Sequence, residues 1–93
     1  MGRKNLCFFS GVIISNPDFK FILNKNLNLK NSLHISICRF ELKLENETIV
    51  TVKAYDELAD FCYSSLKRGE FIAVSGRIND LYEIEIDFCQ RLF

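Results

Sequence analysis

Apolar and polar residues alternate along much of the chain, and this period of two predicts strands. Residues 5–14 form the first predicted strand. Phe8 and Phe9 give this strand an apolar side chain on each face, so we expect it to be central or covered by a partner. Gly11 inside it indicates a bend or a close approach of another backbone. Residues 48–55 alternate as well and predict a strand with one apolar face.

Residues 33–44 predict a long strand whose alternation changes phase. The apolar positions switch from odd to even numbers, in the order Leu33, Ile35, Ile37, Cys38, Phe40, Leu42 and Leu44. A one-residue change of phase is typical of a β-bulge, which small barrels use to turn a strand round a corner. We therefore predict a bulge in this strand.

Residues 56–78 predict one helix that runs directly into a strand. Asp56 is a candidate N-cap, because its carboxylate can accept hydrogen bonds from the first unpaired amides of a helix. Lys67 and Arg68 suit the negative end of the helix dipole in the last turn, and Gly69 can take the left-handed conformation that ends a helix. The period changes to two after this glycine, which predicts another strand.

The end of the chain predicts a hairpin. Asn79-Asp80 is suited to a two-residue turn, and the strand after it has an apolar side and an acidic side. We expect the apolar side to carry Tyr82, Ile84, Ile86 and Phe88, and the acidic side to carry Glu83, Glu85 and Asp87. Earlier in the chain, residues 15–32 predict a long irregular connection with a candidate short strand at Phe19-Lys20-Phe21.

The predicted order is strand, strand, strand, helix, strand, strand. Five strands with one helix between the third and the fourth is the order of the OB-fold, a small Greek-key barrel. A length of 93 residues fits one domain. We therefore predict an all-β fold with one helix, in the form of a single five-stranded OB-fold domain over residues 1–93.

Charge is unevenly spread along the chain, although the formal net charge is zero. Residues 1–43 carry seven basic and two acidic side chains, whereas residues 44–93 carry five basic and ten acidic ones. An anionic partner is therefore expected to meet the first half.

The cysteines do not suggest a metal or redox motif. They are isolated in apolar segments without C-x-x-C spacing, which favours four buried thiols in a reducing compartment and leaves cross-links open: Cys7, Cys38, Cys62 and Cys89. No apolar run reaches the roughly 20 residues of a membrane span. The basic N-terminus is not followed by a signal-peptide cleavage pattern, so we expect a mature protein that acts where it is made.

The sequence does not suggest catalysis. His34 is the only histidine, and at the start of a strand we expect it to be structural. No nucleophile–base pair, phosphate-binding glycine loop or cluster of metal ligands is recognisable. We therefore predict a protein that is not an enzyme and needs no metal or cofactor.

Segments spread over nearly the whole chain resemble the bacterial single-stranded DNA-binding protein family. They are Asn5-Leu6-Cys7-Phe8-Phe9-Ser10-Gly11 with Asn16-Pro17, Ile35-Ser36-Ile37, residues 50–60, and residues 63–78, which are the most specific. The resemblance implies binding of single-stranded DNA without sequence specificity, in replication, repair or nucleoid maintenance. It also implies a homodimer or homotetramer built through the first strand. The length and composition resemble small plastid-encoded or cyanobacterial relatives, which implies the plastid (chloroplast) stroma or the bacterial cytoplasm.

The chain departs from the family pattern at several points. The family stacks bases on aromatic residues, several of them tryptophan, but this chain has no tryptophan, and Lys43 and Ile49 stand where aromatics are expected. Tyr55 is the aromatic residue that matches well. The connection at Asn79-Asp80 is much shorter than the family's DNA-binding loop, and no acidic, glycine-rich tail follows before Phe93.

A binder of single strands needs cations for the phosphates and aromatic faces for the bases. The candidate phosphate contacts lie on the first connection, on the second and third strands, and on the fourth strand: Lys20, Lys25, Lys30, Arg39, Lys43, Lys53 and Arg77. Tyr55 is the candidate for stacking, with Phe19 and Phe21 as weaker ones. We expect any nucleic-acid path to avoid the acidic side of the last strand, because its carboxylates repel phosphates.

A second interpretation is a protein–protein adaptor. OB barrels can serve this role when the chemistry of their groove has been lost, and the fold alone does not decide function. The two apolar faces of the first strand would then be covered by another subunit of a larger assembly. The sequence does not distinguish DNA from RNA, or one oligomeric state from another.

Overall fold

The structure is a computed structural model, and it describes residues 6–23 and 34–92 of the chain. Strands dominate the described part, in which a single helix lies between two strands. The elements in chain order are β1 (Leu6–Ile13), β2 (Asp18–Leu23), β3 (His34–Leu44), β4 (Ile49–Tyr55), α1 (Asp56–Ser65), β5 (Phe71–Ile78) and β6 (Ile84–Arg91).

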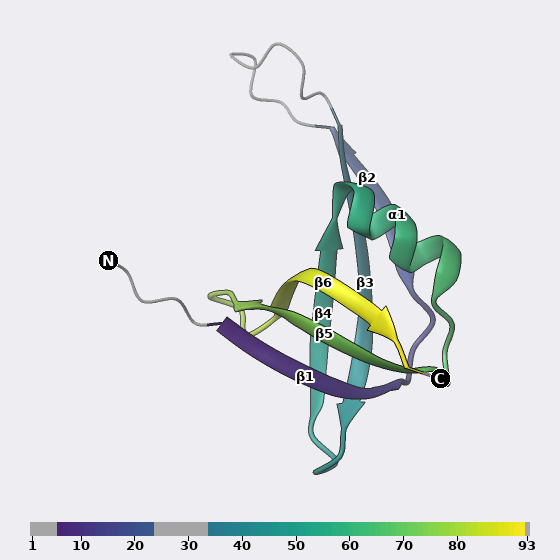
Figure 1. The fold of residues 1–93 in the computed structure, drawn as a ribbon. Coiled ribbons are helices and arrows are strands. Elements are labelled where there is room, and N and C mark those ends of the chain that lie inside the picture. The colour runs from purple at the N-terminus through teal and green to yellow at the C-terminus, as the bar shows by residue number, and fades with distance from the viewer. Residues whose placement is uncertain (1–5, 24–33, 93) are drawn as a thin grey trace.

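Five of these strands close into a barrel (Figure 1). The strands follow the order β1-β5-β6-β4-β3, and the pairing of β1 with β3 closes the circle. β4 and β6 run parallel, and the other pairs are antiparallel. The sixth strand, β2, pairs with the first half of β3 and extends the sheet beyond the barrel. The predicted five-stranded barrel of the OB-fold type is therefore confirmed, and the candidate strand at Phe19-Lys20-Phe21 lies within β2.

The core fills the barrel and is closed at one end by α1. The side chains of Phe40, Leu42 and Val52 are fully or almost fully buried at its centre. α1 lies beside β2, away from the β3–β4 turn (Figure 1), and it buries Ala59 and Cys62 against the same cluster. The helix thus covers one end of a small core, while the outer faces of β3 and β4 stay accessible.

Two glycines allow the barrel to close tightly. A Cβ on Gly11 would clash with the backbone carbonyl of Lys43, where β1 crosses β3. A Cβ on Gly76 would clash with the backbone carbonyl of Glu85 on β6. The prediction of a close backbone approach at Gly11 is confirmed.

The predicted bulge in residues 33–44 is wrong. The pairing of β3 with β4 runs without interruption from Ile37 opposite Tyr55 to Lys43 opposite Ile49. The odd-numbered apolar residues of β3 instead point to the outer face, where Ile37 is partly buried between Lys20 and Tyr55. The phase change in the sequence therefore marks a strand with apolar side chains on both faces.

A register shift occurs instead between β5 and β6. Ser75 pairs with Phe88, but the next residue, Gly76, pairs with Ile86, so β6 contains one extra residue. Because one extra residue reverses which side chains face the core, Ile86 is buried whereas Phe88 is exposed. The expectation that Phe88 shares the apolar side of Ile84 and Ile86 is therefore wrong.

The helix differs from the prediction at both ends. Tyr55 is the N-cap residue and makes no side-chain cap hydrogen bond, while Asp56 is the first helical residue, with a φ of 57° that aspartate tolerates better than most residues. α1 ends at Ser65, because Leu66 is extended and buries its side chain in the core. Lys67 and Arg68 therefore lie beyond the last helical turn. Gly69 is left-handed as expected, with a φ of 96°, but in the turn after the helix.

The connection between β5 and β6 is longer than the predicted two-residue turn. It spans residues 79–83, and Tyr82 within it has a left-handed φ of 63°. Tyr82 is 84% exposed and does not face the core, so its predicted placement beside Ile84 is also wrong.

Two further expectations concern the burial of the four cysteines and the lack of a membrane span. Cys38 and Cys62 are buried, whereas Cys7 and Cys89 are only partly buried, and no disulfide joins cysteines within the described residues. In the same part of the chain, no helix has the length and apolar character needed to cross a membrane.

Candidate nucleic-acid interface

The outer face of β3 and β4 brings three of the predicted site residues together. Arg39 lies directly opposite Lys53, and Ile37 lies opposite Tyr55, one pair further along the same face. The side chain of Arg39 is 55% exposed and that of Lys53 is 22% exposed. The strands thus present two cations and an aromatic ring on one surface, because side chains two residues apart on a strand share a face.

A row of charged residues continues from this face around the barrel. Lys53 lies opposite Glu85 on β6, and Glu85 lies opposite Arg77 on β5. On the other side, Arg39 lies opposite Asp18 on β2. We call this row, Asp18, Arg39, Lys53, Glu85 and Arg77, the charged belt. It joins Arg77, which is far from Arg39 in the sequence, to the same surface.

Glu83 holds the centre of this surface. It is the one polar or charged residue that is buried among those described, with 9% of the residue exposed. Its carboxylate lies 3.1 Å from Lys53 Nζ and 3.9 Å from Arg39 Nε. The Asn79 side-chain amide donates to Glu83 Oε1 at 3.0 Å, and this bond, together with Lys53 and Arg39, keeps the pKa of Glu83 below its usual value. Glu83 is therefore ionised at neutral pH and already pairs with two predicted phosphate contacts.

Glu85 fixes the aromatic side chain of Tyr55. The Tyr55 hydroxyl donates to Glu85 Oε2 at 3.3 Å, and the Asn79 side-chain amide donates to the same oxygen at 2.9 Å. Burial of the hydroxyl, and then the nearby Glu85 carboxylate, raise the pKa of Tyr55. The ring is thus held at the edge of the charged belt in its neutral form.

These contacts correct the predicted position of the acidic side. Glu83 and Glu85 do not lie on a separate surface but touch Arg39, Lys53 and Tyr55 directly. The pattern of β6 alone concealed this, because the parallel pairing of β4 with β6 brings distant residues into contact. A nucleic-acid strand that follows the predicted cations therefore passes over both carboxylates.

The hairpin between β5 and β6 carries an aromatic residue that the sequence pattern assigned to the core. The Asn79 side-chain oxygen accepts from the backbone amides of Leu81 and Glu83, both at 2.9 Å, and Tyr82 N donates to the Asn79 carbonyl at 3.0 Å. This turn exposes Leu81 to 71% and Tyr82 to 84%. Tyr82 also has a left-handed φ of 63°, which is strained for a residue other than glycine. Backbone strain of this kind is often found at functional sites. Asn79 was the available signal, since asparagine commonly organises turns through its side chain.

The remaining predicted residues are more scattered. Lys20 on β2 is exposed opposite Ile37, so it extends the same outer face. Lys25 and Lys30 lie outside the described residues. Among residues 6–23 and 34–92, no ion pair shorter than 4.0 Å includes Lys20 or Arg77.

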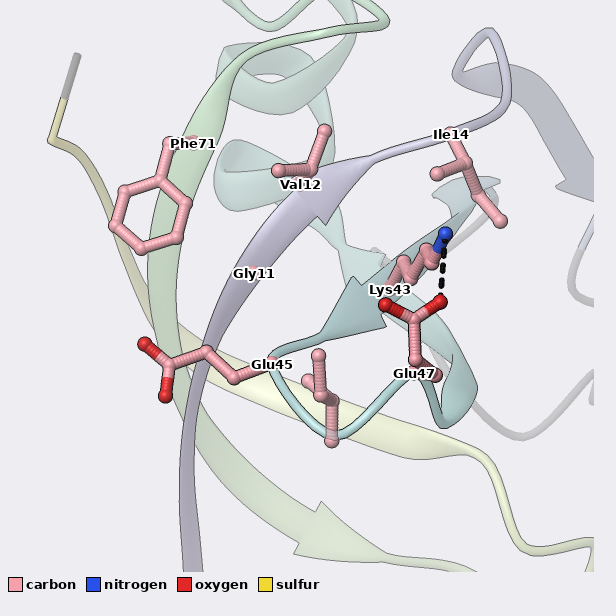
Figure 2. Close-up of a pocket in the computed structure, with 8 residues that line it drawn as sticks. Gly11, Val12, Ile14, Lys43, Glu45, Glu47 and Phe71 are labelled. Carbon is pink, nitrogen blue, oxygen red and sulfur yellow. Dashed lines mark ion pairs between the residues drawn. The ribbon is translucent and has the colours of Figure 1, made fainter.

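Lys43 lies apart from the charged belt, at the far end of β3 opposite Ile49. Its Nζ pairs with Glu47 Oε1 at 2.9 Å, beside a hollow of about 370 Å³ (Figure 2). The residues that line the hollow include the apolar Val12, Ile14 and Phe71. Lys43 is therefore not brought together with Arg39, Lys53 and Tyr55.

The described residues offer no obvious metal site. No group of three or more histidine, cysteine, aspartate or glutamate side chains in that part of the chain is arranged to hold a metal ion. The outer face carries cations, carboxylates and two tyrosines, of which Tyr82 is exposed and Tyr55 partly exposed.

Solved structures with this fold include several single-stranded DNA-binding proteins. The SSB domain of a Synechococcus protein gives a TM-score of 0.76 at 9% sequence identity, over 97% of this chain and 98% of that one. The single-stranded DNA-binding protein of Thermus aquaticus gives 0.74 at 22% identity, over 96% of this chain. The second such protein of Mycobacterium smegmatis gives 0.72 at 19% identity, over 97% of this chain and 90% of that one.

These identities are low, and the likeness establishes the shared fold. This chain spans only 40% of the length of the Thermus aquaticus protein. No protein-family model matches the sequence, and no curated protein matches it. The fold implied by the resemblance in the sequence is thus confirmed.

Proposed function

We propose that the protein binds single-stranded DNA without sequence specificity, across the outer face of β3 and β4 and the tip of the β5–β6 hairpin. The observation that supports this most is the gathering of Arg39, Lys53 and Tyr55 on one face of a barrel shared with single-stranded DNA-binding proteins. Arg39 lies on β3, whereas Lys53 and Tyr55 lie on β4, and the pairing of the two strands brings them together.

Phosphates and bases would be bound by different parts of this face. Arg39, Lys53 and Arg77 of the charged belt, with Lys20 beside it, would neutralise phosphates. Tyr55 and Tyr82 would each stack on a base, and stacking contributes about 1–3 kcal/mol per base. Neither contact reads a base edge, so the binding would not depend on sequence.

The carboxylates would make this binding weak. A phosphate that approaches Lys53 or Arg39 must compete with Glu83, which already pairs with both. We therefore expect a micromolar dissociation constant at low salt, weaker than in a relative that carries tryptophans. Affinity should fall as salt rises, with a log–log slope of about −3 if four phosphates are contacted.

Fluorescence anisotropy of a labelled oligo-dT, titrated at about 50 and 200 mM salt, tests the proposal. Arg39→Ala should weaken binding and flatten the salt dependence. Arg68→Ala, in the exposed turn after α1, is the matched control and should leave binding unchanged. Absence of binding at low salt by the folded protein would refute the DNA proposal.

Tyr82→Asn tests the hairpin tip. Asparagine accepts a left-handed φ better than most residues, so the turn should persist without the ring. The variant should bind oligo-dT about 5-fold or more weakly, with an unchanged salt slope, because stacking does not release counterions. Binding equal to that of the unaltered protein would remove Tyr82 from the interface.

We further propose an oligomer and a cellular role in keeping with the resemblance. The outer face of β1 exposes Leu6 and Phe8, and Phe88 on β6 lies in the same row as Phe8 across β5. This apolar surface supports a homodimer or homotetramer built through β1. Light scattering that finds a monomer would contradict the proposed oligomer.

The cellular role of the protein would be in replication, repair or nucleoid maintenance. Its compartment would be the plastid stroma or the bacterial cytoplasm, and immunolocalisation would test this.

One observation favours the alternative of a protein–protein adaptor. Glu83 pairs with Lys53 and Arg39 within the molecule, which an adaptor would tolerate and a DNA binder would not need. Purification of the native protein distinguishes the two functions. A stoichiometric complex in which the outer face of β3 and β4 is buried on protein would favour the adaptor over DNA binding.

A further inference from the structure

The side chain of Asn79 uses all of its hydrogen-bonding positions. Its amide group donates to Glu83 Oε1 at 3.0 Å and to Glu85 Oε2 at 2.9 Å. Its oxygen accepts from the backbone amides of Leu81 and Glu83, both at 2.9 Å. An asparagine side chain has two donors and one oxygen with two lone pairs. Asn79 thus joins the β5–β6 hairpin to both carboxylates of the proposed DNA face.

The acceptor half of this side chain shapes the tip of the hairpin. The two backbone amides that donate to its oxygen belong to the residues on either side of Tyr82. Tyr82 N itself donates to the Asn79 carbonyl at 3.0 Å. Asparagine commonly organises a turn through such side-chain bonds. These bonds therefore fix the backbone that carries the exposed ring of Tyr82.

The donor half holds two carboxylates that contact a cation and a ring of the outer face. Glu83 pairs with Lys53 at 3.1 Å, and Glu85 Oε2 also accepts from the Tyr55 hydroxyl at 3.3 Å. A carboxylate oxygen that loses a donor seeks another, because an unpaired polar group away from water is costly. Without the Asn79 amide, Glu83 would depend on its cations, which are the groups that a phosphate needs.

We propose that Asn79 is a positioning residue that links the base contact of the DNA face to its phosphate contact. Its oxygen holds the turn that presents Tyr82 to a base. Its amide group restrains Glu83, so that Lys53 keeps one side open to a phosphate. This inference rests on the proposed function and adds to it, since one side chain sets both contacts without touching the DNA itself.

Asn79→Asp tests the donor half, because an ionised carboxyl keeps the acceptor for the turn and loses both donors. At about pH 8, the variant should bind oligo-dT about 10-fold more weakly than the unaltered protein. Glu83 and Glu85 should raise the pKa of the introduced carboxyl, since like charges disfavour ionisation. Protonation at about pH 5 should restore one donor, and the affinity relative to the unaltered protein should recover by about 3-fold or more.

Asn46→Asp is the matched control for this change of charge. The Asn46 side-chain oxygen also supports a turn, by accepting from Thr48 N at 3.1 Å, but it lies in the β3–β4 connection, away from the charged belt. The substitution should alter binding by less than about 2-fold at either pH. Glu83 stays ionised at about pH 5, because its pKa is lowered from 4.5.

Asn79→Ala tests the acceptor half in combination with Tyr82→Asn. In the unaltered protein and in Asn79→Asp, which both keep the turn, Tyr82→Asn should weaken binding about 5-fold. In Asn79→Ala, which releases the turn, the same substitution should cost less than about 2-fold, because the ring is no longer held. Circular dichroism checks that each variant is folded before it is titrated.

The results distinguish this inference from the proposed function. Binding by the unaltered protein, with no loss in Asn79→Asp or with a loss that acid does not recover, would overturn the inference while the function stands. Equal losses in Asn79→Asp and Asn46→Asp would also overturn it, and so would a full cost of Tyr82→Asn in Asn79→Ala. If one of the two Asn79 variants does not fold, the other decides. No binding by the unaltered protein would refute the function, and the inference with it.

Discussion

Replacing Glu83 by glutamine separates the two effects of the carboxylate at the centre of the proposed interface. Glutamine keeps the size of the side chain and an oxygen that can accept the Asn79 hydrogen bond, but it removes the negative charge beside Lys53 and Arg39. A phosphate bound on the open side of Lys53 would lie roughly 6 Å from that charge, which corresponds to a repulsion of about 1–2 kcal/mol at an intermediate dielectric constant. Glu83→Gln should therefore bind oligo-dT about 5- to 30-fold more tightly.

The same substitution should make the protein less stable. The substitution removes the ion pairs of residue 83 with Lys53 and Arg39. Lys53, whose side chain is 22% exposed, is then left without its anion. We expect the free energy of unfolding to fall by about 1.5–3 kcal/mol, because hydrogen bonds to charged groups contribute this much. Urea unfolding measures the loss, and anisotropy on the same sample measures the gain in affinity.

Asp87→Asn is the matched control for this prediction. It makes the same change of charge on β6, four residues after Glu83, but Asp87 is exposed and accepts a hydrogen bond from Ser75 Oγ at 3.0 Å. Its affinity for oligo-dT should change by less than about 2-fold, as expected for a screened surface charge. Equal gains in affinity for both variants would mean that net charge alone matters. Unchanged or weaker binding by folded Glu83→Gln would refute competition between Glu83 and phosphate.

Four further predictions follow from other contacts. Tyr55→Phe keeps the ring and should bind oligo-dT within about 2-fold of the unaltered protein, whereas Tyr55→Ala should lose about 1–3 kcal/mol in an anisotropy titration; equal binding by both would exclude stacking. Acid should destabilise the fold below pH 4.5, since the lowered pKa of Glu83 contributes stability above its unfolded value of 4.5 that is lost as the pH falls through the folded pKa; urea melts of Glu83→Gln should lack this component. Gly76→Ala should cost about 1–3 kcal/mol in urea unfolding, because its Cβ meets the Glu85 backbone, and a neutral result would contradict the close approach. Leu66→Ala should cost about 2–5 kcal/mol, since the side chain is buried, and a cost under 1 kcal/mol would show that it does not end the helix by packing.

The order of elements was predictable because alternation, a helix and turn residues are local signals. Val52 and Ala54 face the core, and the strand that contains them leads straight into α1, as the pattern indicated. The end of the helix was not predictable from its charges. Lys67 and Arg68 suit a last turn, but burying Leu66 outweighs the few tenths of a kcal/mol that such charges contribute at an exposed helix end.

The candidate site was only half predictable, because its contacts join strands that are distant in the sequence. Alternation correctly placed Arg39, Lys53 and Tyr55 on outward faces of their strands. It could not reveal that β6 pairs in parallel with β4 and brings Glu85 beside them. The extra residue in β6 was equally hidden, since Ile86 and Phe88 look alike in the sequence although only the first is buried.

The most direct test of the account is to map the binding surface by NMR, with backbone amide shifts followed during addition of oligo-dT at low salt. The account predicts that the largest shifts cluster at Arg39, Lys53, Arg77 and Tyr82. Amides around Gly11 and Lys43, at the hollow on the other end of β3, should move little. Shifts concentrated at that hollow, or no shifts at all in the folded protein, would contradict it.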